Sequence, residues 1–396
     1  MEAAAPKEKR KSLFMMVGDP SADRNAARMI AELKKSAPHL EIWGCGGSMM
    51  AAEGVEILHN CEEFTVIGAV EIVKRAKFFI DLEKQIVQAL IARKPDAILL
   101  IDFGTFNLKL SKAIRKAGIT SPILYFTSPQ VWGSRPWRIR TIAKTITKML
   151  VIFPFEVAIY RKNSVPVRFV GHPLLKKNVD DDALPSKEEF CANYKIDPNK
   201  PLIGIFAGSR RREVSIFAPT LLKATKGLLN KKSDLQFAFS TANEKLHEQT
   251  RAAIQEHGMA DLMEKNLFLV GKKDNLNLIS ASDLVWAKSG TTTLEVTLFG
   301  KPMLIIYRGD WWEYALYSTL KTINFIGMPN ILAGERLIPE LLQLDCRAEQ
   351  LVKYTDDLMN VPGLRAEISR KLLRLRDQLG QGDYAANLVE EILAVI

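Results

Sequence analysis

Short apolar runs alternate with helix-length amphipathic segments along the first 170 residues of the chain. This alternation predicts a parallel sheet with helices packed on its faces. The clearest predicted strands are residues 13–17, 97–101, 123–126 and 149–153, and a second series follows at 202–206, 235–239, 267–270, 284–287 and 303–306. The pattern therefore predicts an α/β protein with two parallel-sheet domains.

Composition sets the predicted domain boundaries. Residues 176–186 (KKNVDDDALPS) are polar, charged and contain a proline, as expected of a linker. We therefore assign residues 1–175 to an N-terminal domain and 187–362 to a C-terminal domain. Residues 363–396 contain two amphipathic helices, which we expect to return in part to the N-terminal domain. The three aspartates at 180–182 fit a solvated linker better than a metal site.

Charge narrows the class of partner. The chain of 396 residues has a formal net charge of +10, which favours nucleic acid, a membrane surface or a phosphorylated substrate. The first apolar segment is too short for a secretion signal, and no apolar run approaches the roughly 18–20 residues that span a bilayer. Four widely separated cysteines have neither metal-site spacing nor disulfide density. We expect a cytosolic or membrane-peripheral protein with reduced thiols.

The stretch 283–308 has the pattern of a buried strand, a small-residue turn, a short helix and a second strand. Ser289 and Gly290 let backbone amides approach a ligand, and the helix that begins at Thr291 attracts phosphate. Glu295 lies one turn further, where its carboxylate could accept both hydroxyls of a ribose. A purely structural βαβ unit with a hydroxyl cap explains these residues equally well.

A second small-residue turn, AGSRRRE at 207–213, follows the predicted strand 202–206. Three arginines at a helix start suit a diphosphate, although surface solubility explains one or two of them. Further on, residues 328–335 are predicted to form a turn before a helix that contains Glu340 and Gln343.

Polar residues also follow the predicted strands of the N-terminal domain, at the edge where open α/β sheets bind ligands. Asp19, Ser21 and Asp23 follow the first strand, and Asp102 and Asn107 follow strand 97–101. A structural turn with Asp23 as a helix cap is an equal alternative. His172 closes the domain, and a lone histidine is more often structural than catalytic.

An apolar stripe with basic residues occupies part of the segment 63–84. An ordinary core helix explains the stripe, but the basic residues also suit an anionic membrane interface. The apolar residues of the stripe are Val66, Ile67, Val70, Val73 and Ile80, and its basic residues are Lys74, Arg75 and Lys77.

Eight motifs together resemble the lipid-A-disaccharide synthase family. They are GDPSAD (18–23), GCGGSMMAAEG (44–54), SPQVW (128–132), FPFE (153–156), VPVRFVGHP (165–173), AGSRRREV (207–214), SGTTTLE (289–295) and MPNILAGE (328–335). Each is weak alone, but their order and spacing over almost the whole chain are specific.

The resemblance implies an inverting glycosyltransferase of the GT-B type, with two Rossmann-like domains facing a central cleft. The implied donor is UDP-2,3-diacylglucosamine and the implied acceptor is 2,3-diacylglucosamine 1-phosphate, giving a β-1,6-linked disaccharide 1-phosphate and UDP. It also implies no cofactor, no metal, no nucleic-acid partner and peripheral association with the cytoplasmic face of the inner membrane; a homodimer is compatible with it. Acylated substrates favour the membrane interpretation of the stripe.

The resemblance also implies residue roles. Arg210 would stabilise the diphosphate leaving group, and Glu295 would bind the ribose. The implied donor-side residues are Gly208, Ser209, Arg210, Ser289, Gly290, Thr291, Thr292, Glu295, Asn330 and Gln343. The implied acceptor-side residues are Asp19, Ser21, Asp23, Asn107 and His172.

The chain departs from the family at two motifs. Where the family has G-E-x-S-G-D, this chain reads GDPSAD. The family's I-D-x-P-D-F-N appears as residues 101–107, with Thr105 in place of the second aspartate. Threonine is not a useful base at neutral pH, so we expect Asp102 or Asp23, ranked equally, or else Asp19, to assist deprotonation of the acceptor hydroxyl. His172 is a weaker candidate for this role.

Two other function classes fit part of the sequence. Another GT-B enzyme that uses UDP-N-acetylglucosamine, either a transferase or a 2-epimerase, would share Glu295 and the phosphate turn but would not need the apolar basic stripe. A non-enzymatic basic module would bind nucleic acid or a membrane, with the segment SRPWRIR (134–140) stacking on bases, but no nucleic-acid recognition motif accompanies it.

Overall fold

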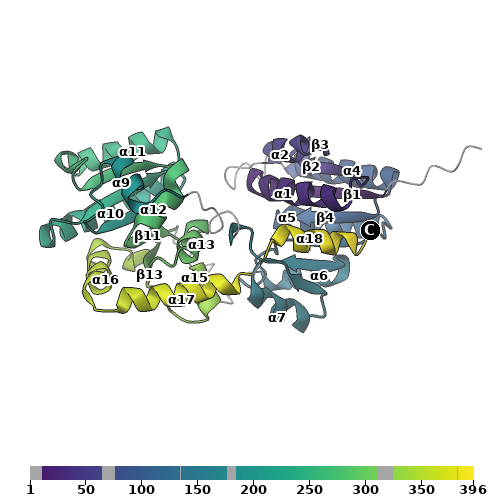
Figure 1. The fold of residues 1–396 in the computed structure, drawn as a ribbon. Helices are drawn as coiled ribbons and strands as arrows, with labels where there is room; N and C mark the ends of the chain where they lie inside the picture. The colour runs from purple at the N-terminus through teal and green to yellow at the C-terminus, as the bar shows by residue number, and fades with distance from the viewer. Residues whose placement is uncertain (1–10, 65–75, 134, 176–183, 310–323, 381) are drawn as a thin grey trace, which may run out of the picture. The chain divides into compact units, whose positions relative to one another are not determined.

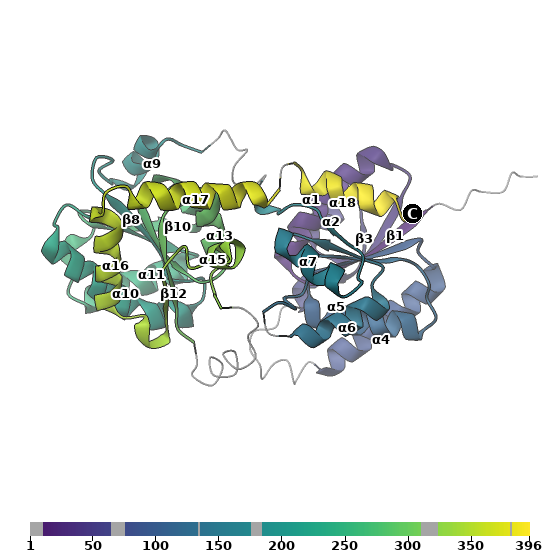
Figure 2. The ribbon, with the colours of Figure 1, turned by 90° about the horizontal axis from the view of Figure 1, so that it is seen from below.

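The structure is a computed structural model that describes residues 11–64, 76–133, 135–175, 184–309, 324–380 and 382–396 (Figure 1). The chain divides into two compact units, residues 1–173 with 379–396 and residues 174–378. Each unit contains one parallel sheet flanked by helices (Figures 1 and 2). The predicted α/β class with two parallel-sheet domains is therefore confirmed.

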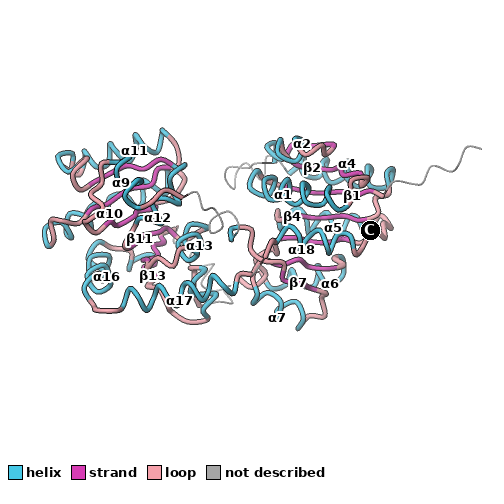
Figure 3. Tube along the Cα trace, viewed as in Figure 1, coloured by secondary structure: helices cyan, strands magenta, loops and turns pink. Residues whose placement is uncertain are grey.

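The sheet of the N-terminal unit has the strand order β3-β2-β1-β4-β5-β6-β7, and all neighbouring pairs are parallel. Its strands are the magenta segments in Figure 3. The apolar runs correctly locate β1, β4 and β5, which are buried along their whole length because helices cover both faces. The pattern misses β2, β3 and β7, which contain glycine or polar residues near the sheet edges. The strands are β1 Ser12–Val17, β2 Glu41–Gly46, β3 Glu56–Asn60, β4 Ala97–Ile101, β5 Ile123–Phe126, β6 Lys148–Val151 and β7 Val167–Phe169.

Helices α1 and α18 cover one face of this sheet, and α4, α5 and α6 cover the other (Figure 2). The C-terminal helix α18 belongs to this unit, as predicted: Tyr384, Leu388 and Ile392 are buried in the same core as β1 and α1. Arg168 also pairs with Glu391 at 2.7 Å. The helices are α1 Pro20–Ser36, α2 Ser48–Ala52, α4 Ala76–Arg93, α5 Gly104–Lys116, α6 Ile139–Thr145, α7 Pro154–Lys162 and α18 Tyr384–Leu393, with 3-10 turns at Cys61–Phe64 and Pro136–Arg138.

The C-terminal unit has the strand order β10-β9-β8-β11-β12-β13, again parallel throughout. All five predicted strands are present. The strands are β8 Leu202–Phe206, β9 Gln236–Thr241, β10 Leu267–Gly271, β11 Leu284–Lys288, β12 Met303–Tyr307 and β13 Glu340–Leu342.

One local prediction in this unit is wrong. The expected helix with Glu340 and Gln343 is instead strand β13 followed by a 3-10 turn, Gln343–Asp345. Pairing of β13 with β12 overrides the local helical pattern, and the Glu340 carboxylate accepts hydrogen bonds from the backbone N–H groups of Ile326 and Gly327. The preceding predicted turn contains the short helix α15.

The helices of the C-terminal unit pack in pairs. Helix α10 packs on α11 and α16, α12 packs on α9, and α13 packs on α15 and α17. The helices are α9 Lys187–Tyr194, α10 Arg211–Lys231, α11 Glu244–Glu256, α12 Asn275–Ala281, α13 Thr291–Leu298, α15 Met328–Ala333, α16 Ala348–Asn360 and α17 Leu364–Gln378, with 3-10 turns at Ala260–Leu262 and Lys272–Asp274.

Strand order reverses direction once in each sheet, between β1 and β4 in one unit and between β8 and β11 in the other. At such a switch point the loops after the two strands run to opposite faces of the sheet, which opens a crevice at the carboxyl ends of the strands. The candidate residues at 19–23, 102–107, 208–210 and 289–295 follow these four strands, whereas Asn330, Gln343 and His172 lie elsewhere in their units.

The cysteines, the apolar stripe and the length of the helices were also subjects of prediction. The four cysteines, Cys45, Cys61, Cys191 and Cys346, are buried and unpaired, as predicted for structural thiols. The stripe residues at 66–75 and the aspartates at 180–182 lie outside the described residues, whereas Lys77 and Ile80 lie in helix α4. Within the described ranges, none of the helices combines the length and apolarity needed to cross a bilayer.

Candidate functional site

The switch point of the C-terminal unit begins with the turn after β8. Gly208 has a φ of +120°, and a β-carbon there would lie 2.4 Å from the Glu213 carboxylate, so only glycine fits. That carboxylate accepts the backbone N–H groups of Ser209 at 2.8 Å and Arg210 at 3.2 Å. It also pairs with Lys288, at the end of β11, at 3.2 Å. Burial opposes ionisation of Glu213, but Lys288 and the N–H donors outweigh it and lower its pKa.

The Arg210 side chain is exposed at this turn. Among the described residues its guanidinium has no hydrogen-bond or ion-pair partner. The turn is therefore held by Glu213 through its backbone, while the Arg210 charge stays available to an anion at the start of α10.

The second half of this switch point follows β11. Ser289 and Gly290 form the turn, and α13 begins at Thr291. The Ser289 hydroxyl donates to the carbonyl of Ile326 at 3.3 Å, which fixes the turn. Glu295 is half-buried in the second turn of α13. The structure thus places the predicted phosphate turn and the predicted ribose residue beside the Arg210 turn.

Two further donor-side predictions have different outcomes. Asn330 is fully buried, and its amide already bonds to Ile338 and Glu340 at 2.8 Å, so it holds the segment before β13 and is not free to contact a ligand. We therefore withdraw Asn330 as a direct donor contact. Gln343 has a left-handed backbone with a φ of 50°, and its buried Nε2 lacks a partner among the described residues. Such an unsatisfied donor suits a ligand contact.

In the N-terminal unit the residues of the GDPSAD motif have different contacts and different exposure. Asp19 is the N-cap of α1 and accepts the N–H groups of Ser21 at 2.8 Å and Ala22 at 3.0 Å. Asp23 is buried, and its carboxylate accepts the N–H groups of Gly47 at 2.7 Å and Met49 at 3.0 Å, which caps α2. Because these donors occupy the Asp23 oxygens, we withdraw Asp23 as a proton acceptor. Ser21 is exposed on the first turn of α1.

Asp102 ends β4 on the other side of the same switch point. Asp102 and Phe103 both have left-handed backbones, with φ values of 48° and 47°. Non-glycine residues rarely adopt this conformation, and the strain persists only where surrounding contacts impose it. The contacts are visible: the Asn107 amide and the Tyr125 hydroxyl donate to the Asp102 carbonyl at 2.9 and 2.6 Å. Asn107, predicted as an acceptor-side residue, thus positions Asp102 from the buried side.

The pKa of the Asp102 carboxyl is raised. Removal of water by the surrounding protein is the main cause, and the nearby Asp19 carboxylate adds to it, against a hydrogen bond from the Phe103 N–H. A carboxylate with a raised pKa is a stronger base than an ordinary aspartate. Its side chain is accessible to solvent, so it remains open to a substrate.

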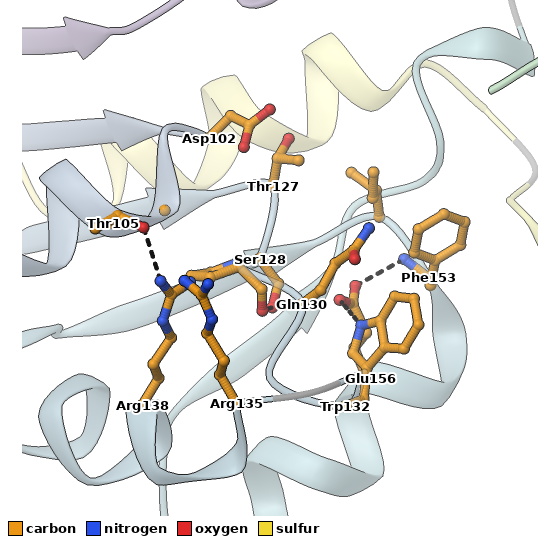
Figure 4. Close-up of a pocket in the computed structure, with 13 residues that line it drawn as sticks. Asp102, Thr105, Thr127, Ser128, Gln130, Trp132, Arg135, Arg138, Phe153 and Glu156 are labelled. Carbon is orange, nitrogen blue, oxygen red and sulfur yellow. Dashed lines mark hydrogen bonds between the residues drawn. The ribbon is translucent and has the colours of Figure 1, made fainter. Parts of the chain in front are cut away.

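A pocket of 410 Å³ opens beside Asp102 at the carboxyl ends of β4, β5 and β6 (Figure 4). It contains two arginines, two carboxyl groups and several hydrogen-bonding side chains. The residues that line it are Asp102, Gly104, Thr105, Thr127, Ser128, Pro129, Gln130, Trp132, Arg135, Arg138, Ile152, Phe153 and Glu156. His172 is not among them; it packs behind Phe153, with ring centroids 5.1 Å apart, and burial lowers its pKa to about 4.

Glu156, the last residue of the FPFE motif, also lines this pocket. Its carboxyl is buried and accepts the Trp132 indole N–H at 3.0 Å and the Phe153 backbone N–H at 3.2 Å (Figure 4). Burial raises its pKa to about 7, against these hydrogen bonds and one from Ser128. The burial of this glutamate depends on the tertiary fold, so the local sequence does not predict it.

The raised pKa of Glu156 predicts a pH effect on stability. Between its ordinary pKa of 4.5 and about 7, the folded protein binds more protons at Glu156 than the unfolded chain does, so this group's contribution to stability falls as pH rises through that window. Glu156→Gln cannot ionise. We expect the wild-type free energy of unfolding to drop by roughly 2–3 kcal/mol more than that of Glu156→Gln between pH 5 and pH 8. Urea unfolding at both pH values measures this, and parallel pH profiles would contradict it.

Arg135 and Arg138 were noted in the sequence only within a basic segment with a tryptophan. In the structure they follow β5, and both point into the pocket near Thr105 (Figure 4). The sequence signal that could have located them is their position after a third parallel strand, because the carboxyl ends of neighbouring parallel strands share one edge.

Comparisons with known proteins agree with this geometry. The family described as Lipid-A-disaccharide synthetase matches residues 13–385. The lipid-A-disaccharide synthase of Geobacter metallireducens is 33% identical over 392 residues, covering 97% of each chain. Lipid-A-disaccharide synthase 1 of Legionella pneumophila strain Philadelphia 1 is 34% identical over 383 residues, covering 96% of this chain and 97% of the relative.

Solved structures extend the likeness at the level of the fold. The UDP-GlcNAc 2-epimerase of Neisseria meningitidis bound to UDP-GlcNAc has a TM-score of 0.63 at 15% identity, covering 97% of this chain and 99% of that one. MurG of Acinetobacter baumannii has a TM-score of 0.59 at 15% identity, covering 98% and 100%. The predicted GT-B fold class is confirmed.

Proposed function

Because the chain belongs to the lipid-A-disaccharide synthase family of glycosyltransferases, we propose that it joins two acylated glucosamines. The donor is UDP-2,3-diacylglucosamine and the acceptor is 2,3-diacylglucosamine 1-phosphate. The products are the β-1,6-linked disaccharide 1-phosphate and UDP. Family membership supports the UDP-sugar class of donor, and the two acylated substrates are the specific part of the proposal.

The observation that carries the mechanism is the Asp102 carboxyl, held in a strained backbone at the switch point and bordering the pocket. In the proposed reaction Asp102 accepts the proton of the acceptor 6-hydroxyl as its oxygen attacks the anomeric carbon of the donor. The C1–O bond to UDP breaks as the new C1–O6 bond forms, so the configuration at C1 inverts. A raised pKa assists Asp102 because proton transfer improves as the pKa approaches the working pH.

The C-terminal unit supplies the proposed contacts to UDP. Arg210 stabilises the charge that develops on the diphosphate, and the backbone amides after Ser289 bind phosphate at the start of α13. Glu295 accepts the ribose hydroxyls, and the unsatisfied Nε2 of Gln343 donates to an acceptor on the nucleotide. Gly208 and Ser209 shape the turn, and Thr291 and Thr292 lie at the helix start.

A substrate comparison tests the proposal. The purified protein is incubated with UDP-2,3-diacylglucosamine or with UDP-N-acetylglucosamine, each with the acylated 1-phosphate acceptor, and the products are identified by mass spectrometry. We expect the disaccharide 1-phosphate from the acylated donor alone. Turnover of only the unacylated donor would remove the acylated-substrate proposal and favour a UDP-N-acetylglucosamine enzyme. The 15% identity to the epimerase supports a shared fold alone, so this alternative is not favoured.

Peripheral membrane association is part of the proposal and rests mainly on the sequence pattern at 66–77. Helix α4, which follows this segment, adds one observation. Phe79 packs inward on Phe103 and Phe106, at 6.1 and 5.8 Å between ring centroids, whereas Ile80 is 41% exposed. Aromatic packing thus connects the residue next to Asp102 to the helix that begins at Ala76, and Ile80 adds exposed apolar area on that helix, which suits contact with a membrane surface.

Replacing Val66, Ile67 and Val70 together by serine should release the protein from anionic vesicles, because apolar contact area and basic charge both contribute to such binding. Flotation with phosphatidylglycerol vesicles measures the bound fraction. Ile91→Ser is a matched control, since Ile91 is 49% exposed near the other end of α4. Circular dichroism shows whether each variant folds; a triple variant that unfolds would mean that these residues belong to the core.

A further inference from the structure

The pocket beside Asp102 contains an arginine pair whose function the glycosyl-transfer scheme leaves open. We propose that Arg135 and Arg138 bind the phosphomonoester of the acceptor sugar within this pocket. This inference rests on the proposed function, because it assigns the acceptor phosphate of that reaction to named side chains.

Both guanidinium groups lack an acidic partner within the described part of the chain. The Arg138 guanidinium donates to the Thr105 hydroxyl at 2.7 Å, and the Arg135 guanidinium has no hydrogen bond or ion pair with a described residue. Burial lowers the pKa of Arg138, and repulsion by the like charge of Arg135 in the same pocket adds to this effect. A phosphate dianion between them removes this repulsion and accepts hydrogen bonds from both planar donors.

The residue at position 105 keeps this charge available. A carboxylate at this position, beside Arg138, would neutralise one of the two cations. Thr105 is neutral, and its hydroxyl leaves other N–H groups of the guanidinium without a partner. The other carboxyl groups of the pocket do not pair with the arginines: the Glu156 carboxyl bonds to Trp132 and Phe153, and Asp102 forms no ion pair with either of them.

The position of the pair relative to Asp102 links phosphate binding to the reaction. Arg135, Arg138 and Asp102 line one pocket, with both guanidinium groups pointing toward Thr105 (Figure 4). The phosphate and the attacking 6-hydroxyl belong to the same sugar. Fixing the phosphate therefore restricts where the hydroxyl lies relative to the Asp102 carboxylate, and orientation of this kind lowers the barrier to reaction.

The experiment compares two acceptors, the acylated glucosamine with and without its 1-phosphate, in the wild type and in Arg135→Gln. Arg135 has no described side-chain partner, so its loss should not change folding, which thermal unfolding checks. We expect the wild type to prefer the phosphorylated acceptor in kcat/KM, and Arg135→Gln to reduce that preference about tenfold or more, the loss of one charge-assisted contact. Arg140→Gln removes an exposed charge that does not line the pocket and should keep the wild-type preference.

The outcomes separate this inference from the proposed function. If the wild type forms disaccharide but Arg135→Gln loses rate equally with both acceptors, or loses none, the phosphate assignment is wrong and the glycosyl transfer stands. If the wild type forms no disaccharide, the proposed function fails. The pocket is then tested by titration calorimetry with glucosamine 1-phosphate: binding to the wild type that Arg135→Gln abolishes supports a phosphomonoester site, and equal binding by both overturns it.

A phospholipid headgroup offers the same phosphate chemistry, so a further experiment distinguishes it from the phosphate of the acceptor sugar. Flotation with phosphatidylglycerol vesicles is repeated for Arg135→Gln and Arg140→Gln. Equal vesicle binding, together with the altered acceptor preference, supports the acceptor phosphate. A loss of vesicle binding confined to Arg135→Gln, with unchanged acceptor preference, would assign the pair to the membrane surface and overturn the proposal.

Discussion

Asp102→Asn is expected to lower kcat by about 10²- to 10⁴-fold, the range that one general base contributes. Asparagine keeps the shape of the side chain and, with its amide, tolerates the left-handed backbone at φ 48°. Asn107 and Tyr125 hold the carbonyl of residue 102, so the local structure should persist. What is lost is the proton acceptor. Steady-state turnover with the two acylated substrates measures the effect.

Asp19→Asn provides the matched control for this prediction. Asparagine is as good an N-cap as aspartate, so α1 should keep its first turn. The Asp19 charge raises the pKa of Asp102, and its removal should lower that pKa and move the acidic limb of the kcat/KM profile to lower pH. A base role is excluded if Asp102→Asn retains more than a tenth of the wild-type kcat, or if Asp19→Asn leaves the acidic limb unchanged.

Arg210→Ala is expected to lower kcat by about 10²-fold, or about 3 kcal/mol, by analogy with removal of a donor that stabilises charge in the transition state. Negative charge on the diphosphate increases as the bond to the sugar breaks, so the arginine should matter more in the transition state than in the bound donor. KM for the donor should therefore change less than kcat. Initial rates over a range of donor concentrations separate the two constants.

Arg211→Ala controls for the loss of one positive charge at the same turn. The Arg211 side chain is exposed at the first position of α10, one residue after Arg210. We expect Arg211→Ala to change kcat by less than threefold. Such a small change would mean that the effect of Arg210→Ala comes from the position of Arg210 and not from positive charge near the turn in general. An effect of Arg210→Ala on KM alone would assign Arg210 to uniform donor binding and refute the leaving-group role.

The sequence determined most of the architecture. Strands such as β4 and β8 are buried on both faces and therefore appear as continuous apolar runs, which is why their bounds were readable. The same reasoning located the turn at Gly208 and the turn at Ser289, because parallel strands place such turns at one edge of the sheet. Strands near the edges, including β3 and β13, contain polar residues and escaped the pattern.

The choice among the carboxylates was decided only by the tertiary structure. In the sequence Asp23 and Asp102 were equal candidates, since each follows a buried strand. In the fold, N–H groups of Gly47 and Met49 approach Asp23 from a segment more than twenty residues away and occupy its oxygens. No local pattern encodes that approach, which depends on how α2 packs beside α1.

The pocket beside Asp102 is likewise a product of the tertiary structure. Arg135, Arg138, Thr105 and Glu156 follow three different strands, and only the parallel alignment of β4, β5 and β6 brings them to one edge. Local sequence sets the turn, the cap and the apolar strand, because these depend on neighbouring residues. Burial, and with it the pKa of Glu156 and the repulsion between the two arginines, depends on atoms that the fold brings from elsewhere in the chain.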